Sequence, residues 1–269
     1  MAIVLAVTNQ KGGVGKTTTS VNLAASLAAI KRRVLLIDLD PQGNATMGSG
    51  VDKSDLDASV YEVLVDGTTI KEALINAESS GYDLVGSNVE LTGAEVELLA
   101  LDRREYRLAE ALVPVRDNYD FVVIDCPPSL SLLTINGLVA ADAVIIPMQC
   151  EYYALEGLSA LVSTISRITS HLNPNLAIEG ILRTMYDPRN SLTRDVSQQL
   201  LDHFGDKVYR TVIPRNVRLA EAPSYGLPVL YYDKQSRGAK AYLALASELA
   251  RRYEPEPRIM PTTSRQSGE

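Results

Sequence analysis

The chain has 269 residues, of which 46% are apolar and 22% charged, a composition typical of a folded globule with one large domain. No stretch approaches the roughly 18 consecutive apolar residues that a membrane-spanning helix needs, and no signal peptide is evident. Two cysteines and two histidines disfavour a disulfide scaffold, a histidine-rich metal site and a Ser–His–Asp triad. We therefore expect a protein of the reducing cytoplasm.

The net charge of −7 is unevenly distributed along the chain. Residues 180–252 contain 12 Lys and Arg against 7 Asp and Glu, whereas residues 1–179 contain 12 against 23. An acidic protein with this asymmetry can present a local basic face. Ordinary scatter of charged residues is the alternative explanation.

Short runs rich in Val, Ile and Leu alternate with amphipathic stretches of helix length. The runs predict buried strands at residues 2–8, 33–38, 82–86, 121–125, 143–147, 178–185 and 208–213. The amphipathic stretches predict helices at residues 17–29, 105–115, 132–140, 154–171, 192–204 and 239–253. This alternation is typical of the α/β class and predicts a mostly parallel, twisted sheet with helices on both faces.

The chain shows no internal repeat and no linker rich in Pro, Gly or Ser before residue 253. We therefore expect a single domain over residues 1–253. Residues 254–269 contain three prolines among many polar residues, which predicts a disordered tail.

A glycine-rich segment, residues 9–18, links the first expected strand to the first expected helix. Its glycines let backbone N–H groups turn inward around an anion, and the helix N-terminus adds partial positive charge. Lys16 is expected to reach the β- and γ-phosphates of a nucleotide, and the Thr17 hydroxyl to bind Mg²⁺. The segment therefore predicts a phosphate-binding loop that holds nucleotide through Gly12, Gly13, Val14, Gly15, Lys16, Thr17 and Thr18.

The loop departs from the generic pattern, which has glycine six positions before the lysine. This chain has Gln10 there, followed by an additional lysine, Lys11. In this respect it resembles the deviant Walker A motif of the ParA/MinD family of P-loop ATPases. The similarity continues through residues 38–44, 125–129, 149–158 and 213–224, where it resembles the chromosomal ParA (Soj) group in particular.

The resemblance extends over about residues 1–252 and implies binding of ATP and Mg²⁺ with ATP-dependent homodimerisation. It further implies that Lys11 crosses the dimer interface and contacts the nucleotide of the partner subunit. Dimerisation and competence for hydrolysis would then be coupled.

Two carboxylates follow apolar runs. Asp40 is expected to end a buried strand and to orient the attacking water at the γ-phosphate, as its family counterpart does. Asp125 is expected to hold Mg²⁺ through water, as a Walker B carboxylate. A turn residue at Asp40 and a strand-end cap at Asp125 are the structural alternatives. Catalysis would consist of positioning and charge neutralisation by Lys11, Lys16 and Asp40.

Two further groups of residues are assigned through the resemblance. Pro214 and Asn216, in the loop after a late strand, are expected to contact adenine. Arg189 and Arg218 are expected to bind double-stranded DNA without sequence preference, with a solvated face of local ion pairs as the alternative. No helix-turn-helix precedes the phosphate loop, so we expect contacts mainly to phosphates, which an ATP dimer would double.

The sequence thus predicts an ATP-switched DNA-segregation ATPase that associates with the nucleoid. The implied partner is a ParB-type centromere-binding protein that stimulates hydrolysis. A membrane-cycling regulator like MinD would need a C-terminal amphipathic helix, which Pro255, Pro257 and Pro261 disfavour, so no membrane partner is expected. An amidoligase of the same fold, such as dethiobiotin synthetase, would need a substrate pocket that the sequence does not indicate.

Overall fold

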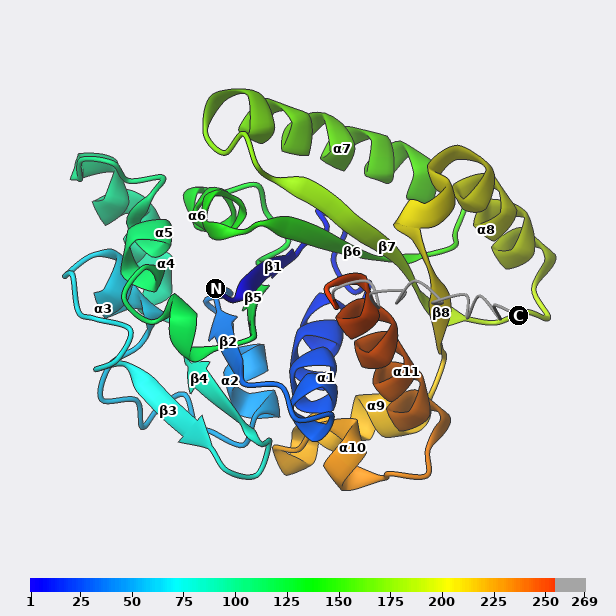
Figure 1. The fold of residues 1–269 in the computed structure, drawn as a ribbon, viewed down its shortest axis with the longest axis horizontal. Coiled ribbons are helices and arrows are strands. Elements are labelled where there is room, and N and C mark those ends of the chain that lie inside the picture. Colours follow the sequence, from blue (N-terminus) through cyan, green and yellow to red (C-terminus); the bar gives the residue numbers. More distant parts are fainter. Residues whose placement is uncertain (255–269) are drawn as a thin grey trace, which may run out of the picture.

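The computed structural model describes residues 1–254, and its central feature is one eight-stranded sheet (Figure 1). The strand order is β3-β4-β2-β5-β1-β6-β7-β8, and every neighbouring pair is parallel except β3 with β4. The strands are β1 (Ile3–Val7), β2 (Val34–Asp38), β3 (Leu74–Ala77), β4 (Tyr82–Val85), β5 (Phe121–Asp125), β6 (Ala143–Gln149), β7 (Ala177–Tyr186) and β8 (Val208–Pro214). The mostly parallel α/β sheet expected from the sequence is confirmed.

Helices cover both faces of the sheet, with α6 and α7 on one face and α1 and α11 on the other (Figure 1). The helices are α1 (Lys16–Ala29), α2 (Asn44–Gly48), α3 (Val60–Leu64), α4 (Leu91–Glu97), α5 (Arg107–Leu112), α6 (Leu132–Ala140), α7 (Ala154–His171), α8 (Ser191–Phe204), α9 (Val217–Glu221), α10 (Val229–Tyr232) and α11 (Arg237–Arg252). Alternate residues of β6 belong to two separate hydrophobic clusters, with Val144 and Ile146 in one and Ala143 and Ile145 in the other. Because both faces of the strands are buried, their sequences are continuous apolar runs.

The sequence prediction missed one strand and several short helices. β3 is a four-residue edge strand in which Leu74 and Ile75 are partly buried, Asn76 is exposed and only Ala77 is buried, so it lacks a continuous buried apolar run. Its antiparallel pairing with β4 depends on a tight turn at Gly81, where φ is +79°. The expected helix at residues 105–115 is shorter than predicted, because α5 has six residues and ends at Leu112.

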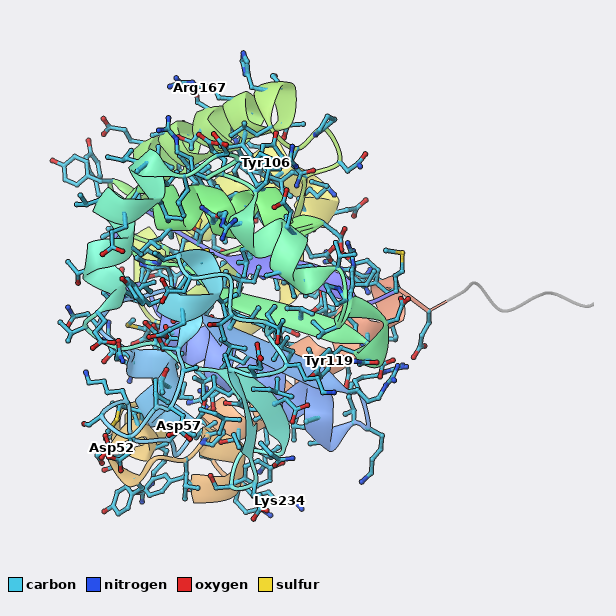
Figure 2. All side chains as sticks on the ribbon, turned by 90° about the vertical axis from the view of Figure 1, so that its left-hand side faces the viewer. Asp52, Asp57, Tyr106, Tyr119, Arg167 and Lys234 are labelled. Carbon is cyan, nitrogen blue, oxygen red and sulfur yellow. The ribbon has the colours of Figure 1, made fainter. Side chains whose placement is uncertain are left out.

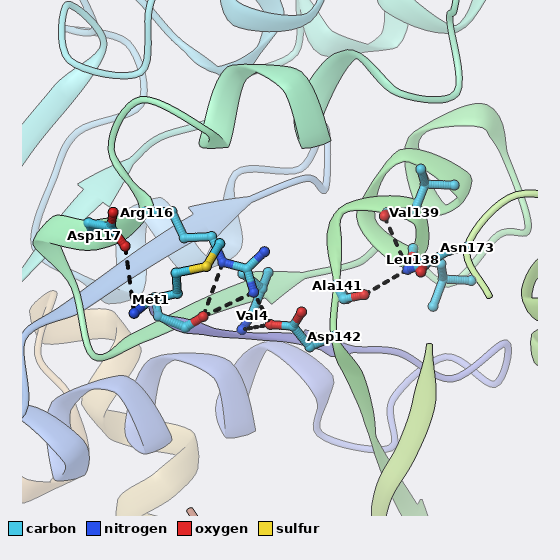
Figure 3. A network of polar contacts seen from close by, with 10 residues as sticks. Met1, Val4, Arg116, Asp117, Leu138, Val139, Ala141, Asp142 and Asn173 are labelled. Carbon is cyan, nitrogen blue, oxygen red and sulfur yellow. Dashed lines mark hydrogen bonds and ion pairs between the residues drawn. The ribbon is translucent and has the colours of Figure 1, made fainter. Parts of the chain in front are cut away.

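Polar contacts fix the start of the central strand β1 (Figure 3). The carboxylate of Asp142, directly before β6, accepts a hydrogen bond from the Val4 amide at 2.8 Å and pairs with Arg116. The Arg116 guanidinium also donates to the carbonyl of Ala2. Nearby, the Asn173 amide donates to three carbonyls at the end of α6, those of Leu138, Val139 and Ala141. The contacts of Asp142 and Arg116 hold the start of β1 against β5 and β6, and those of Asn173 fix the end of α6.

The segment between β4 and β5 is attached to the rest of the fold by two tyrosines (Figure 2). The Tyr106 hydroxyl donates to the carbonyl of Leu172, just after α7, at 3.1 Å. The Tyr119 hydroxyl donates to the Asp83 carboxylate of β4 at 2.8 Å. The segment that contains α4 and α5 is therefore attached both to the end of α7 and to β4.

The chain end was expected to be a disordered tail over residues 254–269. Glu254 is described and pairs with Arg32 at 2.7 Å. The rest of the expected tail, residues 255–269, lies outside the described residues. Within residues 1–254, no helix is both long enough and apolar enough to cross a bilayer.

Candidate nucleotide-binding site

The glycine-rich loop leaves β1 at the carboxyl edge of the sheet and ends at the N-terminus of α1. Gly13 and Gly15 have φ of +73° and +89°, values that favour glycine because other residues would place a Cβ against the backbone. Two neighbouring strands anchor the loop: the Asn9 amide donates to the Pro147 carbonyl at 2.8 Å, and the Thr184 hydroxyl donates to the Val14 carbonyl at 2.8 Å. The loop is therefore pre-formed, with its backbone N–H groups at a helix N-terminus, as an anion site requires.

Lys16 is the first residue of α1 and is 7% exposed. Its ammonium group donates to the carbonyl of Lys11 at 3.3 Å, across the loop. Burial lowers the pKa of Lys16, and the charges of Asp125 and Asp40 act in the opposite direction. The structure thus brings together Lys16 and the two predicted carboxylates.

Asp125 and Asp38 are the last residues of the adjacent strands β5 and β2, where they occupy the same register position. Both are fully buried, and Ser20 donates to Asp125 Oδ1 at 2.8 Å. Burial and the neighbouring Asp38 raise the pKa of Asp125, while hydrogen bonds from Ser20 and Thr17 lower it. Asp125 Oδ2 is buried and has no hydrogen-bond partner in residues 1–254.

An unpartnered carboxylate oxygen beside the Thr17 hydroxyl fits a hard cation such as Mg²⁺. Mg²⁺ takes one or two carboxylates and completes its shell with phosphate oxygens and water. Within residues 1–254, no group of three or more His, Cys, Asp or Glu side chains is arranged to hold a metal by itself. The remaining ligands of such an ion would come from phosphate oxygens and water.

The expectation that Asp40 ends a strand is wrong, because β2 ends two residues earlier at Asp38. Leu39 still donates to the Asp125 carbonyl at 2.9 Å, but Pro41 has no N–H to continue the ladder. Asp40 therefore lies in the turn that leads from β2 to α2. Its side chain is partly exposed, and its Oδ1 accepts a hydrogen bond from the Gln42 amide at 3.0 Å.

A cavity of about 340 Å³ adjoins the loop on the side of β8. Gly15 and Thr18 of the loop line it together with Pro214 and Asn216, the two predicted adenine contacts. Asn216 uses its side-chain oxygen to cap α9, accepting from the Arg218 amide at 2.9 Å. Larger cavities of about 780 and 650 Å³ occur elsewhere, but no loop residue lines them. We therefore identify the candidate nucleotide cavity by its lining residues and not by its size.

Lys11 lies on the outer side of the loop. Its ammonium group pairs with the Glu151 carboxylate at 2.6 Å, at the start of the segment leading into α7. Tyr152 and Tyr153 follow with exposures of 74% and 71%, which is high for aromatic side chains. Sequence reasoning assigned no role to Glu151, whose proximity to Lys11 depends on the adjacency of β1 and β6.

The two predicted DNA contacts also lie beyond the carboxyl ends of strands. Arg189 follows β7 and pairs with Asp187 at 2.7 Å, and its side chain is 88% exposed. Hydrogen bonds from Arg189, with a contribution from Arg215 after β8, lower the pKa of Asp187 to about 2. Arg218 pairs with Glu221 at 2.7 Å and with Asp233 at 3.3 Å. Both arginines therefore form local ion pairs, as expected from the alternative interpretation of a solvated face.

Comparison with known proteins agrees with this architecture. Residues 2–178 match the family model described as an AAA domain. The sporulation initiation inhibitor protein Soj of Bacillus subtilis is 55% identical over 93% of this chain and 99% of its own length. The chromosome partitioning protein ParA of Caulobacter vibrioides is 52% identical over 93% of this chain and 94% of its own.

A solved structure named cobyrinic acid a,c-diamide synthase from Mycobacterium smegmatis, with bound ADP and magnesium, is also similar. It aligns with a TM-score of 0.83 and 42% identity over 94% of this chain and 96% of its own. The sheet and the loop define a P-loop nucleotide-binding protein of the deviant Walker A class. With its relatives, the chain belongs to the ParA/Soj family of chromosome-partitioning ATPases.

Proposed function

We propose that this chain is a DNA-segregation ATPase whose nucleotide state controls its affinity for DNA, with residues 1–253 acting as one ATPase domain. The observation that carries the proposal is the juxtaposition of three features at one edge of the sheet. These are the pre-formed phosphate loop, the buried carboxylate of Asp125, and arginine-bearing loops next to the base-sized cavity. Ligand binding at the carboxyl edge is general in open α/β sheets.

The loop would bind the phosphates of ATP through its backbone N–H groups and Lys16. Thr17 and Asp125, the latter through water, would hold Mg²⁺, which neutralises phosphate charge when bound. Pro214 and Asn216 would pack against and hydrogen-bond the adenine. The free Oδ2 of Asp125 and the cavity beside Gly15 support these assignments.

Hydrolysis converts ATP and water to ADP and phosphate. Asp40 would orient the attacking water, since it lies in the turn just after β2, at the same edge of the sheet as the phosphate loop. Lys11 of the partner subunit would add positive charge where the γ-phosphoryl group leaves. Because Lys11 is at the exposed side of the loop, it is placed to reach outward once its contact with Glu151 is released.

Arg189 and Arg218 would contact DNA phosphates without reading the bases. A monomer offers few such contacts, whereas an ATP dimer presents two copies and therefore a steeper dependence on salt. A basic segment of a ParB-type protein would stimulate hydrolysis and so release the dimer. This cycle would place the protein in the cytoplasm, associated with the nucleoid.

A second candidate is an amidoligase, which the name of the Mycobacterium smegmatis structure suggests. Such an enzyme would use ATP to activate a carboxylate for attack by ammonia. The 340 Å³ cavity beside the loop is lined by the two residues proposed to contact adenine, so we assign it to the nucleotide rather than to a second substrate, which favours the partitioning function.

The deciding experiment measures retention of the full chain on random-sequence duplex DNA with ATP, with ADP and without nucleotide. We expect retention with ATP alone, and its loss in Lys16→Ala, which should no longer bind nucleotide. Equal retention in all three conditions would contradict the proposal. Binding to anionic lipid vesicles instead of DNA would indicate a MinD-like cycle, and ATP turnover that requires ammonia and a carboxylic acid would indicate an amidoligase.

A further inference from the structure

The backbone on both sides of Asp40 is held by hydrogen bonds that do not involve its own carboxylate. The Asp40 amide donates to Asp38 Oδ1 at 3.1 Å. The Asp40 carbonyl accepts from the hydroxyl of Ser87 at 2.9 Å and from the Gly43 amide at 2.9 Å. The peptide groups that determine where the Asp40 side chain points are thus fixed by Asp38 and Ser87.

Thr46, in α2, connects these two anchors. Its hydroxyl donates to Asp38 Oδ2 at 2.8 Å and accepts from the Ser87 amide at 2.9 Å. Its own amide donates to the same Asp38 oxygen at 2.9 Å. Asp40, Asp38, Thr46 and Ser87 therefore form a closed ring of hydrogen bonds.

The ring is buried and closely packed. Asp38, Thr46 and Ser87 each have no exposed surface. Gly43 has a φ of +62°, and a Cβ there would lie 2.6 Å from the Ser87 carbonyl oxygen. The turn that carries Asp40 can approach residue 87 only because glycine occupies position 43.

We propose that Thr46 and Ser87 are positioning residues for hydrolysis, which act through the backbone of Asp40. The inference rests on the proposed function, in which Asp40 orients the attacking water. Displacement of a reacting group by about 1 Å can lower a rate about 100-fold. Neither hydroxyl belongs to the phosphate loop or lines the cavity beside it, so binding of the nucleotide should not depend on them.

The chain offers a matched control. Ser80, before β4, is also fully buried, and its hydroxyl also donates to a backbone carbonyl, that of Ser49, at 2.9 Å. Ser87→Ala and Ser80→Ala thus remove the same kind of hydrogen bond at opposite ends of one strand. Thr46→Val removes the hydroxyl while preserving shape, and Thr46→Ser keeps it.

The experiment measures kcat and KM for ATP at saturating Mg²⁺ and DNA in the full chain, with circular dichroism and thermal melting to compare folding. We expect Ser87→Ala and Thr46→Val to lower kcat about tenfold with KM within about twofold. We expect Thr46→Ser to restore most of kcat, and Ser80→Ala to keep wild-type kcat despite a similar melting temperature change.

Equal kcat for Ser87→Ala and Ser80→Ala would overturn the inference, as would a rise in KM alone. The Asp40→Ala variant shows whether the positioning role of Ser87 alone is wrong or whether the proposed role of Asp40 is wrong as well. If Asp40→Ala is inactive while Ser87→Ala is fully active, only the inference fails. If Asp40→Ala hydrolyses ATP at the wild-type rate, the assigned role of Asp40 fails as well.

Discussion

Lys11 and Glu151 form an ion pair of 2.6 Å within one chain, although they are separated by 140 residues. The side chains are 46% and 51% exposed, and exposed pairs contribute only about 0–1 kcal/mol. The contact therefore holds Lys11 weakly against its own subunit. A lysine required by a partner subunit could leave this contact at small cost.

A dimer releases two such pairs, one from each subunit, so Glu151→Gln should strengthen the ATP-dependent dimer by no more than about thirtyfold in dissociation constant. Sedimentation velocity with ATP measures the dissociation constant of the dimer. An Asp40→Ala background prevents hydrolysis of ATP during the measurement. Glu156→Gln, an exposed neighbour in α7, is the control and should leave the dimer unchanged. A weaker dimer in Glu151→Gln would mean that Glu151 itself acts across the interface.

Gly12→Val should fold and bind nucleotide but fail to dimerise. A Cβ at Gly12 would meet nothing within 4 Å, and φ there is outside the left-handed region, so the isolated subunit can accept the change. A loss of dimerisation would therefore arise from the valine side chain at position 12, where a second subunit approaches the loop. Light scattering with ATP tests this, with calorimetry to verify nucleotide affinity; a full dimer would contradict the proposed interface.

Asp40→Ala should bind Mg²⁺-ATP normally, lose hydrolysis, and accumulate as the ATP dimer. Within residues 1–254, Asp40 forms no hydrogen bond to the phosphate loop, so the loop should keep its shape, whereas the water would no longer be oriented. Phosphate release and size-exclusion chromatography measure the two effects. Asp55→Ala, an exposed acid in the following loop, should behave as wild type.

Arg189→Ala and Arg218→Ala should each weaken binding of the ATP dimer to random-sequence duplex. Two copies per dimer correspond to about two phosphate contacts, so the slope of log K against log[salt] should decrease by about 1.8. Arg218 is neutralised by Glu221 and Asp233, so we expect the smaller effect there. Arg167→Ala, exposed near the far end of α7 (Figure 2), is the control, and an equal loss in it would indicate a general effect of net charge.

Gly180→Ala should destabilise the fold, because its Cβ would lie 2.5 Å from the buried ring of Tyr209. Overpacking of this kind costs about 1–3 kcal/mol in the free energy of unfolding. Urea unfolding measures this decrease in the free energy of unfolding. Gly157→Ala in α7, where a Cβ would meet nothing within 4 Å, should instead stabilise the chain by up to about 1 kcal/mol.

Long elements could be predicted from the sequence because their patterns are continuous. β5, α6 and α7 have the predicted bounds, since each is a complete apolar or amphipathic run. Helices of four to seven residues, such as α2 and α4, span too few turns for a 3.6-residue period to be recognised.

The phosphate loop was predictable because its function depends on consecutive residues. The ring that holds Asp40 was not, because Ser87 is 41 residues from Thr46 and reaches it only through the adjacency of β2 and β4. A single serine after a strand carries no local signal of such a contact. The expected strand at residues 33–38 does end at Asp38, but the sequence alone did not reveal that Asp40, two residues later, lies in the following turn.

The position of β1 in the middle of the sheet determines when the nucleotide loop can form during synthesis. β1 is made first, yet its partners start at Phe121 and Ala143, more than 100 residues later. At about 5–20 residues per second, the ribosome needs on the order of ten seconds to supply them. β1 therefore has no strand on either side until β5 has emerged, and it gains its second neighbour only with β6. A nascent chain interrupted before residue 121 would possess the entire phosphate-binding sequence and no site.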